Sequence, residues 1–191
     1  MSEPRATSLT RRVVVMHGVN LDQLGRRPPP YPQMTLAELE RGIEGDARAL
    51  GFAASFFHTN HEGEYVERLH ALRGPPTQAD AVILNTGAWT HYAWAIRDAL
   101  EIAVSAGVLA AEVHLTDVSE RARREPWRGV SVIGELCAVR VAGRGAEGYR
   151  DALELLRERL DEHPDGHAPR GTAPPGADPE GGRQAGRRGG A

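Results

Sequence analysis

The sequence holds a histidine and a glutamate whose spacing suits acid–base chemistry. Glu112 and His114 lie two residues apart in the segment EVHLTD, directly after the small apolar run AGVLAA. On an extended strand such side chains point the same way, so the carboxylate can orient the imidazole and raise its basicity. A histidine held like this can act as a general acid or base. The same spacing also suits a buried histidine with a structural partner, and taken alone it leaves both interpretations open.

A second candidate group is a tyrosine that shares a proline-rich segment with two arginines. Tyr31 follows Arg26 and Arg27 in LGRRPPPYPQM, residues 24–34. A nearby guanidinium favours the phenolate, which can then take a proton from a substrate. Long loops of this kind often act as lids over an active site. The alternative interpretation is a proline-stiffened surface loop.

The composition excludes several classes of chemistry. All 23 of the Lys and Arg residues are arginine, so a lysine Schiff base and a phosphate-loop lysine are both excluded. Cys137 is the only cysteine, which excludes an internal disulfide and a cysteine-based zinc site. Five histidines fall where strands are expected to end, but no HxH or HExxH spacing occurs, so we expect no metal and no other cofactor.

The composition also bears on partners and location. The formal net charge of −3 gives no reason to expect nucleic acid or an anionic membrane as a partner. No apolar run is long enough to span a bilayer, and we expect no signal peptide. We therefore expect a cytoplasmic protein.

The apolar pattern predicts elements that bring the candidate groups together. Strands are expected at 12–16, 52–58, 81–84, 109–115 and within 131–142, and helices at 36–50, 62–72, 90–106 and 146–161. Thr35 and Glu38 form a capping box at the start of the first helix. Alternation of fully apolar strands with helices predicts a single α/β domain, a flavodoxin-like doubly wound parallel sheet of five strands.

One folded domain is expected over residues 11–162. Residues 1–10 are polar and are expected to be a flexible N-terminus. Residues 163–191 are rich in Gly, Pro and Arg and contain no Leu, Ile, Val or aromatic residue. Such a segment buries too little apolar surface to offset the entropy of ordering, so we expect a disordered tail.

Polar clusters follow four of the expected strands. They are HGVN (17–20), HTNHEGE (58–64), NTGAWTH (85–91) and EVHLTD (112–117). Doubly wound sheets bind ligands outside the carboxyl ends of their strands, near the point where the strand order reverses. The four clusters are therefore expected to form one site.

Seven segments in collinear order together resemble the type II 3-dehydroquinate dehydratases. They are HGVNLDQLG, RRPPPYPQMT, TNHEGE, NTGAWTHYAWAIRDAL, EVHLTD, REPWR and GRGAEGY. The resemblance covers about residues 12–157 and implies a carbon–oxygen lyase that converts 3-dehydroquinate to 3-dehydroshikimate. That family removes water by anti elimination through an enolate, without a metal or a Schiff base, which agrees with the missing lysines.

The resemblance also carries roles for five catalytic residues. Tyr31 would be the base that takes a proton from C2, and Arg27 would keep it ionised. Asn20 would stabilise the enolate through a water molecule. His114 would protonate the departing hydroxyl, and Glu112 would orient His114.

Further residues would bind the substrate. By the same match, its hydroxyls and carboxylate would be held by Asn85, His91, Arg128 and the backbone around Leu115 and Thr116. Asp98 would reach the site of a neighbouring subunit, because the family forms trimers assembled into homododecamers. The pathway would be the shikimate route to aromatic amino acids or the catabolism of quinate. A paralogue acting on a related cyclic hydroxy-acid, or a catalytically silent small-molecule-binding protein, remain as alternatives.

The lid departs from the family pattern. Four steps separate Arg27 from Tyr31, whereas the family has five, so Arg26 restores the spacing and can take the role instead. Pro32 replaces a glycine after the tyrosine, which fixes φ and removes a backbone donor.

Two other departures concern the site. His17 replaces an asparagine of the family pattern. About three residues are inserted before REPWR, so either Arg121 or Arg124 corresponds to the first arginine of that motif.

Overall fold

The structure is a computed structural model that describes residues 11–74 and 78–162. The segments predicted to be flexible, 1–10 and 163–191, lie outside the described residues. Within the described part of the chain, no helix is long and apolar enough to cross a membrane.

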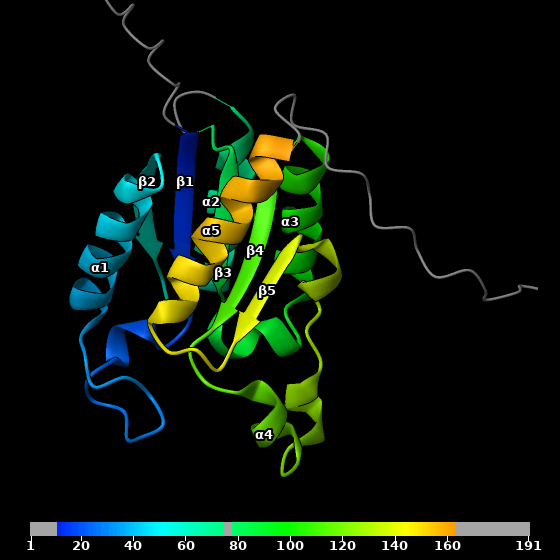
Figure 1. Ribbon diagram of the computed structural model, residues 1–191. Coiled ribbons are helices and arrows are strands. Elements are labelled where there is room, and N and C mark those ends of the chain that lie inside the picture. The colour runs from blue at the N-terminus through cyan, green and yellow to red at the C-terminus, as the bar shows by residue number, and fades with distance from the viewer. Residues whose placement is uncertain (1–10, 75–77, 163–191) are drawn as a thin grey trace, which may run out of the picture.

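Five parallel strands form one sheet in the order β2-β1-β3-β4-β5 (Figure 1). Their bounds are β1 Arg11–His17, β2 Phe52–His58, β3 Ala81–Asn85, β4 Leu109–His114 and β5 Val139–Ala142. The chain first moves outward from β1 to β2 and then returns past β1 to β3, so the strand order reverses between β1 and β3. The predicted flavodoxin-like, doubly wound α/β fold is confirmed.

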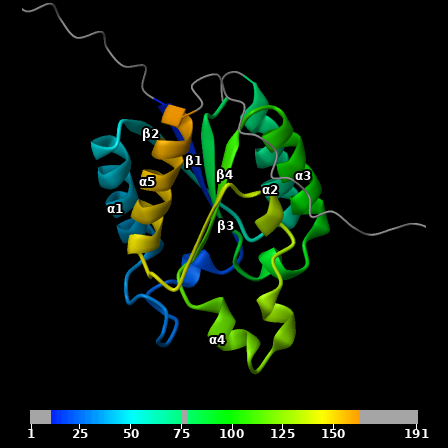
Figure 2. The same cartoon turned by 45° about the vertical axis from the view of Figure 1, so that its right-hand side comes forward.

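Helices cover both faces of this sheet (Figures 1 and 2). On one face α1 (Leu36–Ala49) and α5 (Glu147–Glu162) pack over Val13 and Val15 of β1. On the other face α2 (Glu62–His70) and α3 (Trp94–Ser105) pack over Val14 and Met16. Alternate residues of one strand therefore enter two separate cores, which explains why the strands read as continuous apolar runs.

The predicted capping box starts α1. The Thr35 hydroxyl accepts the Glu38 backbone N–H at 3.2 Å, and the Glu38 carboxylate accepts the Thr35 backbone N–H at 2.8 Å. Two otherwise unpaired amide groups at the helix start are satisfied in this way.

Some segments differ from the sequence expectation. The helix expected from residue 90 begins at Trp94, because a 3₁₀ turn over Gly87–His91 precedes it. The short helix α4 (Val118–Ala122) and the 3₁₀ turn Pro126–Gly129 were not predicted. Neither has a buried residue, so no apolar periodicity marks them in the sequence. They project beyond the carboxyl ends of the strands, where the predicted site lies (Figure 2).

Candidate active site

The loops after β1 and β3 lie in direct backbone contact at the carboxyl edge of the sheet. The Gly18 N–H donates to the Asn85 carbonyl at 2.8 Å. A Cβ added at Gly18 would lie 2.5 Å from the Thr86 carbonyl oxygen, and one at Gly87 would lie 2.6 Å from the Val19 carbonyl oxygen. Gly87 also has φ +64°. Glycine is needed at both positions so that the HGVN and NTG segments can approach each other.

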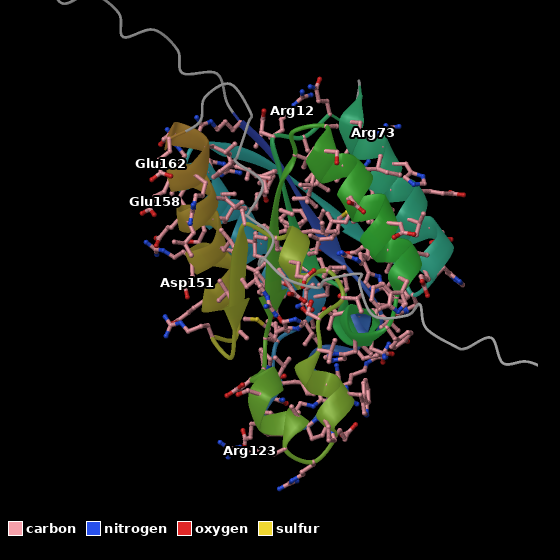
Figure 3. The ribbon with its side chains drawn as sticks, turned by 90° about the vertical axis from the view of Figure 1, so that its right-hand side faces the viewer. Arg12, Arg73, Arg123, Asp151, Glu158 and Glu162 are labelled. Atoms are coloured by element: carbon pink, nitrogen blue, oxygen red, sulfur yellow. The ribbon has the colours of Figure 1, made fainter. Side chains whose placement is uncertain are left out.

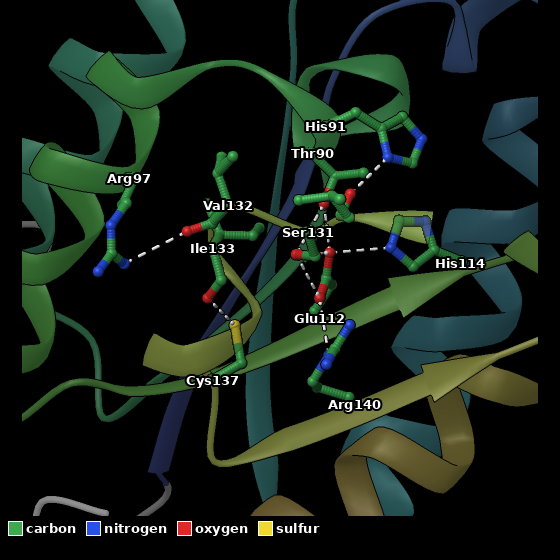
Figure 4. Close-up of polar contacts among 11 residues, drawn as sticks. Thr90, His91, Arg97, Glu112, His114, Ser131, Val132, Ile133, Cys137 and Arg140 are labelled. Carbon is green, nitrogen blue, oxygen red and sulfur yellow. Dashed lines mark hydrogen bonds and ion pairs between the residues drawn. The ribbon is translucent and has the colours of Figure 1, made fainter. Parts of the chain in front are cut away.

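The predicted pair at the end of β4 is formed (Figure 4). Nε2 of His114 lies 2.9 Å from Oε1 of Glu112, and the Glu112 side chain is only 1% exposed. An ionised carboxylate can only accept hydrogen bonds, so Nε2 carries the hydrogen. The other ring nitrogen, Nδ1, is left to exchange a proton with a ligand.

Glu112 receives three further donors. The Thr90 hydroxyl donates to Oε1, the Ser131 hydroxyl lies 2.8 and 3.0 Å from the two carboxylate oxygens, and Arg140 Nε lies 3.1 Å from Oε2. Burial by itself would raise the pKa of Glu112. The hydrogen bond and charge of His114, with the hydrogen bonds from Thr90 and Ser131, outweigh that effect and lower the pKa to about 2. Glu112 is therefore an anion at neutral pH.

Tyr31 lies between two arginines that contact different parts of its side chain. Arg121 Nη1 donates a hydrogen bond of 2.7 Å to the phenol oxygen. The guanidinium carbon of Arg27 lies 3.4 Å from the ring centroid, which is a cation–π contact. Arg26 is exposed. Of the two arginines left open by the lid spacing, Arg27 is therefore the one against Tyr31.

Of the two arginines left open by the insertion, Arg121 is the one that contacts Tyr31. Arg121 lies in α4, on the segment that follows His114. Arg123, two residues further on, points outward from this part of the molecule (Figure 3), and Arg124 is exposed. The hydrogen bond between Arg121 and Tyr31 therefore joins the loop after β1 to the segment after β4.

Hydrogen bonds within the lid hold Tyr31 inward. Nε2 of Gln33 donates to the carbonyls of Arg27 at 2.9 Å and Tyr31 at 3.0 Å. The Tyr31 N–H donates to the Pro28 carbonyl at 3.3 Å. The Tyr31 ring packs against the core on the α1 and α5 side of the sheet. Pro32 is compatible with this shape.

Asn85 is fixed by a buried chain of polar groups that the sequence did not reveal. Its Nδ2 donates to the Tyr149 hydroxyl at 2.9 Å, and that oxygen lies 3.3 Å from Nδ1 of His17. Burial, with a smaller contribution from His58, lowers the pKa of His17 to about 3. His17 is therefore neutral, and its Nδ1 can accept the Tyr149 hydrogen. This chain sets the orientation of the Asn85 amide.

His91 and Arg128 lie in a second polar group beside the His114 pair. Nδ1 of His91 lies 2.7 Å from the Val130 carbonyl, and its ring meets Trp127 edge-on at 5.2 Å. The Arg128 guanidinium lies 4.1 Å from the Trp127 ring centroid. Burial lowers the pKa of His91, and the hydrogen bond to Val130 offsets only part of this effect.

Asn20, Leu115 and Thr116 occupy loops at the same edge. Asn20 has φ +67°, a left-handed conformation that asparagine tolerates, and its N–H donates to Oδ1 of Asn60 at 2.8 Å. Leu115 and Thr116 are buried directly after β4, where the Leu115 carbonyl accepts the Gly145 N–H at 3.0 Å.

Asp98 is separate from these groups. It is exposed on α3, in a shallow hollow lined by Arg73, Glu101, Ile102, Ser105 and Ala106. None of these neighbours belongs to the predicted site. Over residues 11–74 and 78–162, no group of three His, Cys, Asp or Glu side chains is placed to hold a metal ion.

The arrangement thus offers a phenol held by two guanidiniums and an imidazole held by a buried carboxylate, at one edge of the sheet. The contacts of Tyr31 with Arg121 and of Glu112 with Thr90, Ser131 and Arg140 were not predicted. Each of these contacts joins segments far apart in the chain, so no pattern within one segment indicates it. The lid and the EVH spacing could be recognised because each lies within a single short segment.

Comparison with known proteins gives a consistent result. The family model described as dehydroquinase class II matches residues 11–157. The chain is 41% identical over 151 residues to 3-dehydroquinate dehydratase 2 of Pseudomonas putida, covering 78% of this chain and 95% of that one. It is 39% identical over 152 residues to the 3-dehydroquinate dehydratase of Thermotoga maritima, covering 79% and 98%.

Solved structures show the same likeness. A type II dehydroquinase from Butyrivibrio crossotus superposes with a TM-score of 0.71 at 29% identity, covering 78% of this chain and 99% of that one. One from Propionibacterium acnes gives 0.69 at 31% identity, covering 80% and 99%.

Proposed function

The chain belongs to the class II dehydroquinase family, and we propose that it is a 3-dehydroquinate dehydratase. It removes water from 3-dehydroquinate to give 3-dehydroshikimate. One observation supports placing this activity at the site described above. The Tyr31 phenol, held by Arg121 and Arg27, lies at the same sheet edge as the His114–Glu112 pair. An elimination needs a base and an acid, and this edge of the sheet supplies both.

The reaction begins at Tyr31. As phenolate it takes the proton from C2 of the substrate, and the electron pair moves into the neighbouring ketone to give an enolate. Arg121 supports the ionised oxygen by a charge-assisted hydrogen bond, and Arg27 adds its charge at the ring face. A water molecule held by Asn20 donates to the enolate oxygen as its charge develops.

His114 completes the elimination. Nδ1 of the imidazolium gives a proton to the departing hydroxyl, the carbon–oxygen bond breaks, and the enolate collapses to the conjugated enone. The proton taken by Tyr31 and the proton lost by His114 are exchanged with solvent before the next turnover. Glu112 keeps the ring oriented and stabilises its charged form through the 2.9 Å hydrogen bond.

Substrate binding falls to the remaining groups. Arg128 offers a guanidinium for the substrate carboxylate, together with backbone amides near Leu115 and Thr116. Asn85, with its amide orientation set by Tyr149, and His91, with one ring nitrogen committed to Val130, hold the ring hydroxyls. A site that pairs substrate hydroxyls in this way rejects analogues that lack them.

An exposed face of α3 is suited to a contact between subunits. Trp94, Asp98 and Ile102 lie on one exposed face of α3, with Trp94 62% and Ile102 41% exposed. Large apolar groups beside a carboxylate that is remote from its own site suit a contact through which Asp98 enters a neighbouring subunit's site. We infer a trimer-based homododecamer in the cytoplasm, and light scattering of the purified protein measures its mass.

The function is tested by ultraviolet absorbance with 3-dehydroquinate. Dehydration creates a conjugated enone carboxylate, so absorbance rises as product forms. We expect turnover that neither a chelator nor borohydride abolishes, because the proposed mechanism uses no metal and no Schiff base. A folded protein with no turnover would contradict the proposal.

A further inference from the structure

Arg140 contacts the site from the edge strand β5, and we propose that it is a positioning residue for the acid step. Its guanidinium compensates the charge of Glu112 while His114 gives up and regains a proton. This inference rests on the proposed dehydratase function, in which His114 is the acid. Neither the EVHLTD pair nor the lid pattern pointed to a residue on this strand.

The sheet itself brings Arg140 to Glu112. The two residues are register partners on the parallel strands β4 and β5, so their side chains leave the same face of the sheet. Nε of Arg140 lies 3.1 Å from Oε2 of Glu112, on the oxygen opposite the one that contacts His114 (Figure 4). The Arg140 side chain is 56% exposed, whereas that of Glu112 is 1% exposed. The guanidinium therefore reaches the buried carboxylate from the solvent side.

Gly134 leaves the space in which this guanidinium lies. A Cβ at Gly134 would lie 2.8 Å from Cζ and 3.0 Å from Nε of Arg140. The 2.8 Å distance is shorter than real Cβ contacts, so a side chain at 134 would displace the guanidinium. Gly134 does not have a positive φ, so the contact with Arg140 is what an added Cβ would disturb there.

The charges explain why the acid step needs this partner. Before proton transfer, the Glu112 anion lies next to the His114 cation and the Arg140 cation. After His114 has given its proton away, its ring is neutral, and the other donors to Glu112, Thr90 and Ser131, are neutral hydroxyls. Arg140 is then the cation that remains in contact with the buried carboxylate. Without it, proton loss would leave a buried, uncompensated charge, so His114 would hold its proton more tightly.

The test compares Arg140→Met and Arg140→Lys with wild type. We expect Arg140→Met to lower kcat roughly tenfold, as for loss of a charge-assisted hydrogen bond that is partly screened by solvent, with KM little changed. Arg140→Lys should restore a large part of kcat, since it returns the positive charge. The matched control is Arg150→Met, because Arg150 has a similarly exposed side chain that pairs with Glu154 on α5. It should leave kcat unchanged.

Two further variants separate a charge effect from a general loss of packing. Gly134→Ala keeps the arginine but displaces it, so it should lower kcat about as much as Arg140→Met does. When Gly134→Ala is combined with Arg140→Met, kcat should fall little further. In a Glu112→Gln background, where the anion is gone, Arg140→Met should have almost no further effect on kcat. If Arg140→Met acts equally with and without the Glu112 charge, or if Arg140→Lys gives no rescue, the inference is wrong.

An inactive wild type would overturn the proposed function but not the Arg140–Glu112 contact. That contact has its own readout in the low-field proton NMR signal of the His114 Nε2–H, which is hydrogen-bonded to Glu112. Removing Arg140 leaves Glu112 a stronger acceptor, so the signal should move further downfield in Arg140→Met and stay in place in Arg150→Met. An unchanged signal in Arg140→Met would show that Arg140 does not act on the pair.

Discussion

If Tyr31 is the base, as proposed, its two arginines should contribute unequally to catalysis, because one contacts the phenol oxygen and the other contacts the ring. Arg121 donates a 2.7 Å hydrogen bond to the phenol oxygen. In the proposed mechanism this oxygen takes the substrate proton. Hydrogen bonds to charged groups contribute about 1.5–3 kcal/mol. Since about 1.4 kcal/mol is tenfold in rate, Arg121→Met should lower kcat by roughly 10- to 150-fold at neutral pH.

Arg27 should matter less. Its guanidinium carbon lies 3.4 Å from the ring centroid, and cation–π contacts contribute about 0.5–2 kcal/mol, which corresponds to roughly 2- to 30-fold in kcat. The exposed Arg26 serves as the matched control from the same loop, and Arg26→Met should leave kcat unchanged.

The assay is the initial rate of enone formation, measured for each variant at several pH values and saturating substrate. For Arg121→Met, the loss should be in kcat, because the arginine contacts the phenol and not the substrate-binding groups. Circular dichroism at each pH confirms that the variant is folded. The reasoning is refuted if Arg27→Met is more damaging than Arg121→Met, or if neither variant changes the rate.

Three other predictions concern the acid–base pair and the fold. Tyr31→Phe and His114→Ala should each lower turnover by orders of magnitude while circular dichroism stays native; retained activity in either removes its assigned role. The folded-state pKa of His17 is about 3, below its ordinary 6.5, so the unfolded chain binds the proton first as the pH drops. The free energy of unfolding should therefore fall between pH 6.5 and 3, by at most about 1.4 kcal/mol per pH unit. Urea unfolding should show a smaller fall in His17→Asn. Thr35→Ala removes half of the capping box and should cost about 1 kcal/mol in thermal unfolding; no change would show that the cap is unimportant.

The fold could be predicted because its signals are local. Continuous apolar strands between amphipathic helices indicate a parallel sheet with two covered faces, and the capping box at Thr35 marked the start of a helix. The short helix α4 escaped prediction because it buries no residue and so leaves no periodicity. Its position nevertheless matters, since it carries the arginine that contacts Tyr31.

In the site, too, contacts between residues close in sequence could be predicted, whereas contacts between distant segments could not. Glu112 and His114 are two residues apart on one strand, so their spacing was enough to predict a contact. Tyr31 and Arg121 are 90 residues apart, and the insertion before REPWR left two arginines as candidates. The packing of α4 places Arg121, and not the exposed Arg124, against Tyr31. Arg140 was missed for a related reason, because the register of β5 against β4 is not encoded in either strand alone.

The stereochemistry of the elimination tests the central claim most directly, because that claim places base and acid on separate elements around the substrate. The substrate is 3-dehydroquinate with deuterium at C2 on the face opposite the departing hydroxyl, and the product is analysed by proton NMR. If Tyr31 takes the proton on one face while His114 protonates the hydroxyl on the other, the deuterium is lost and the product carries hydrogen at C2. Product that retains the deuterium would mean a syn elimination and would contradict the roles assigned to Tyr31 and His114.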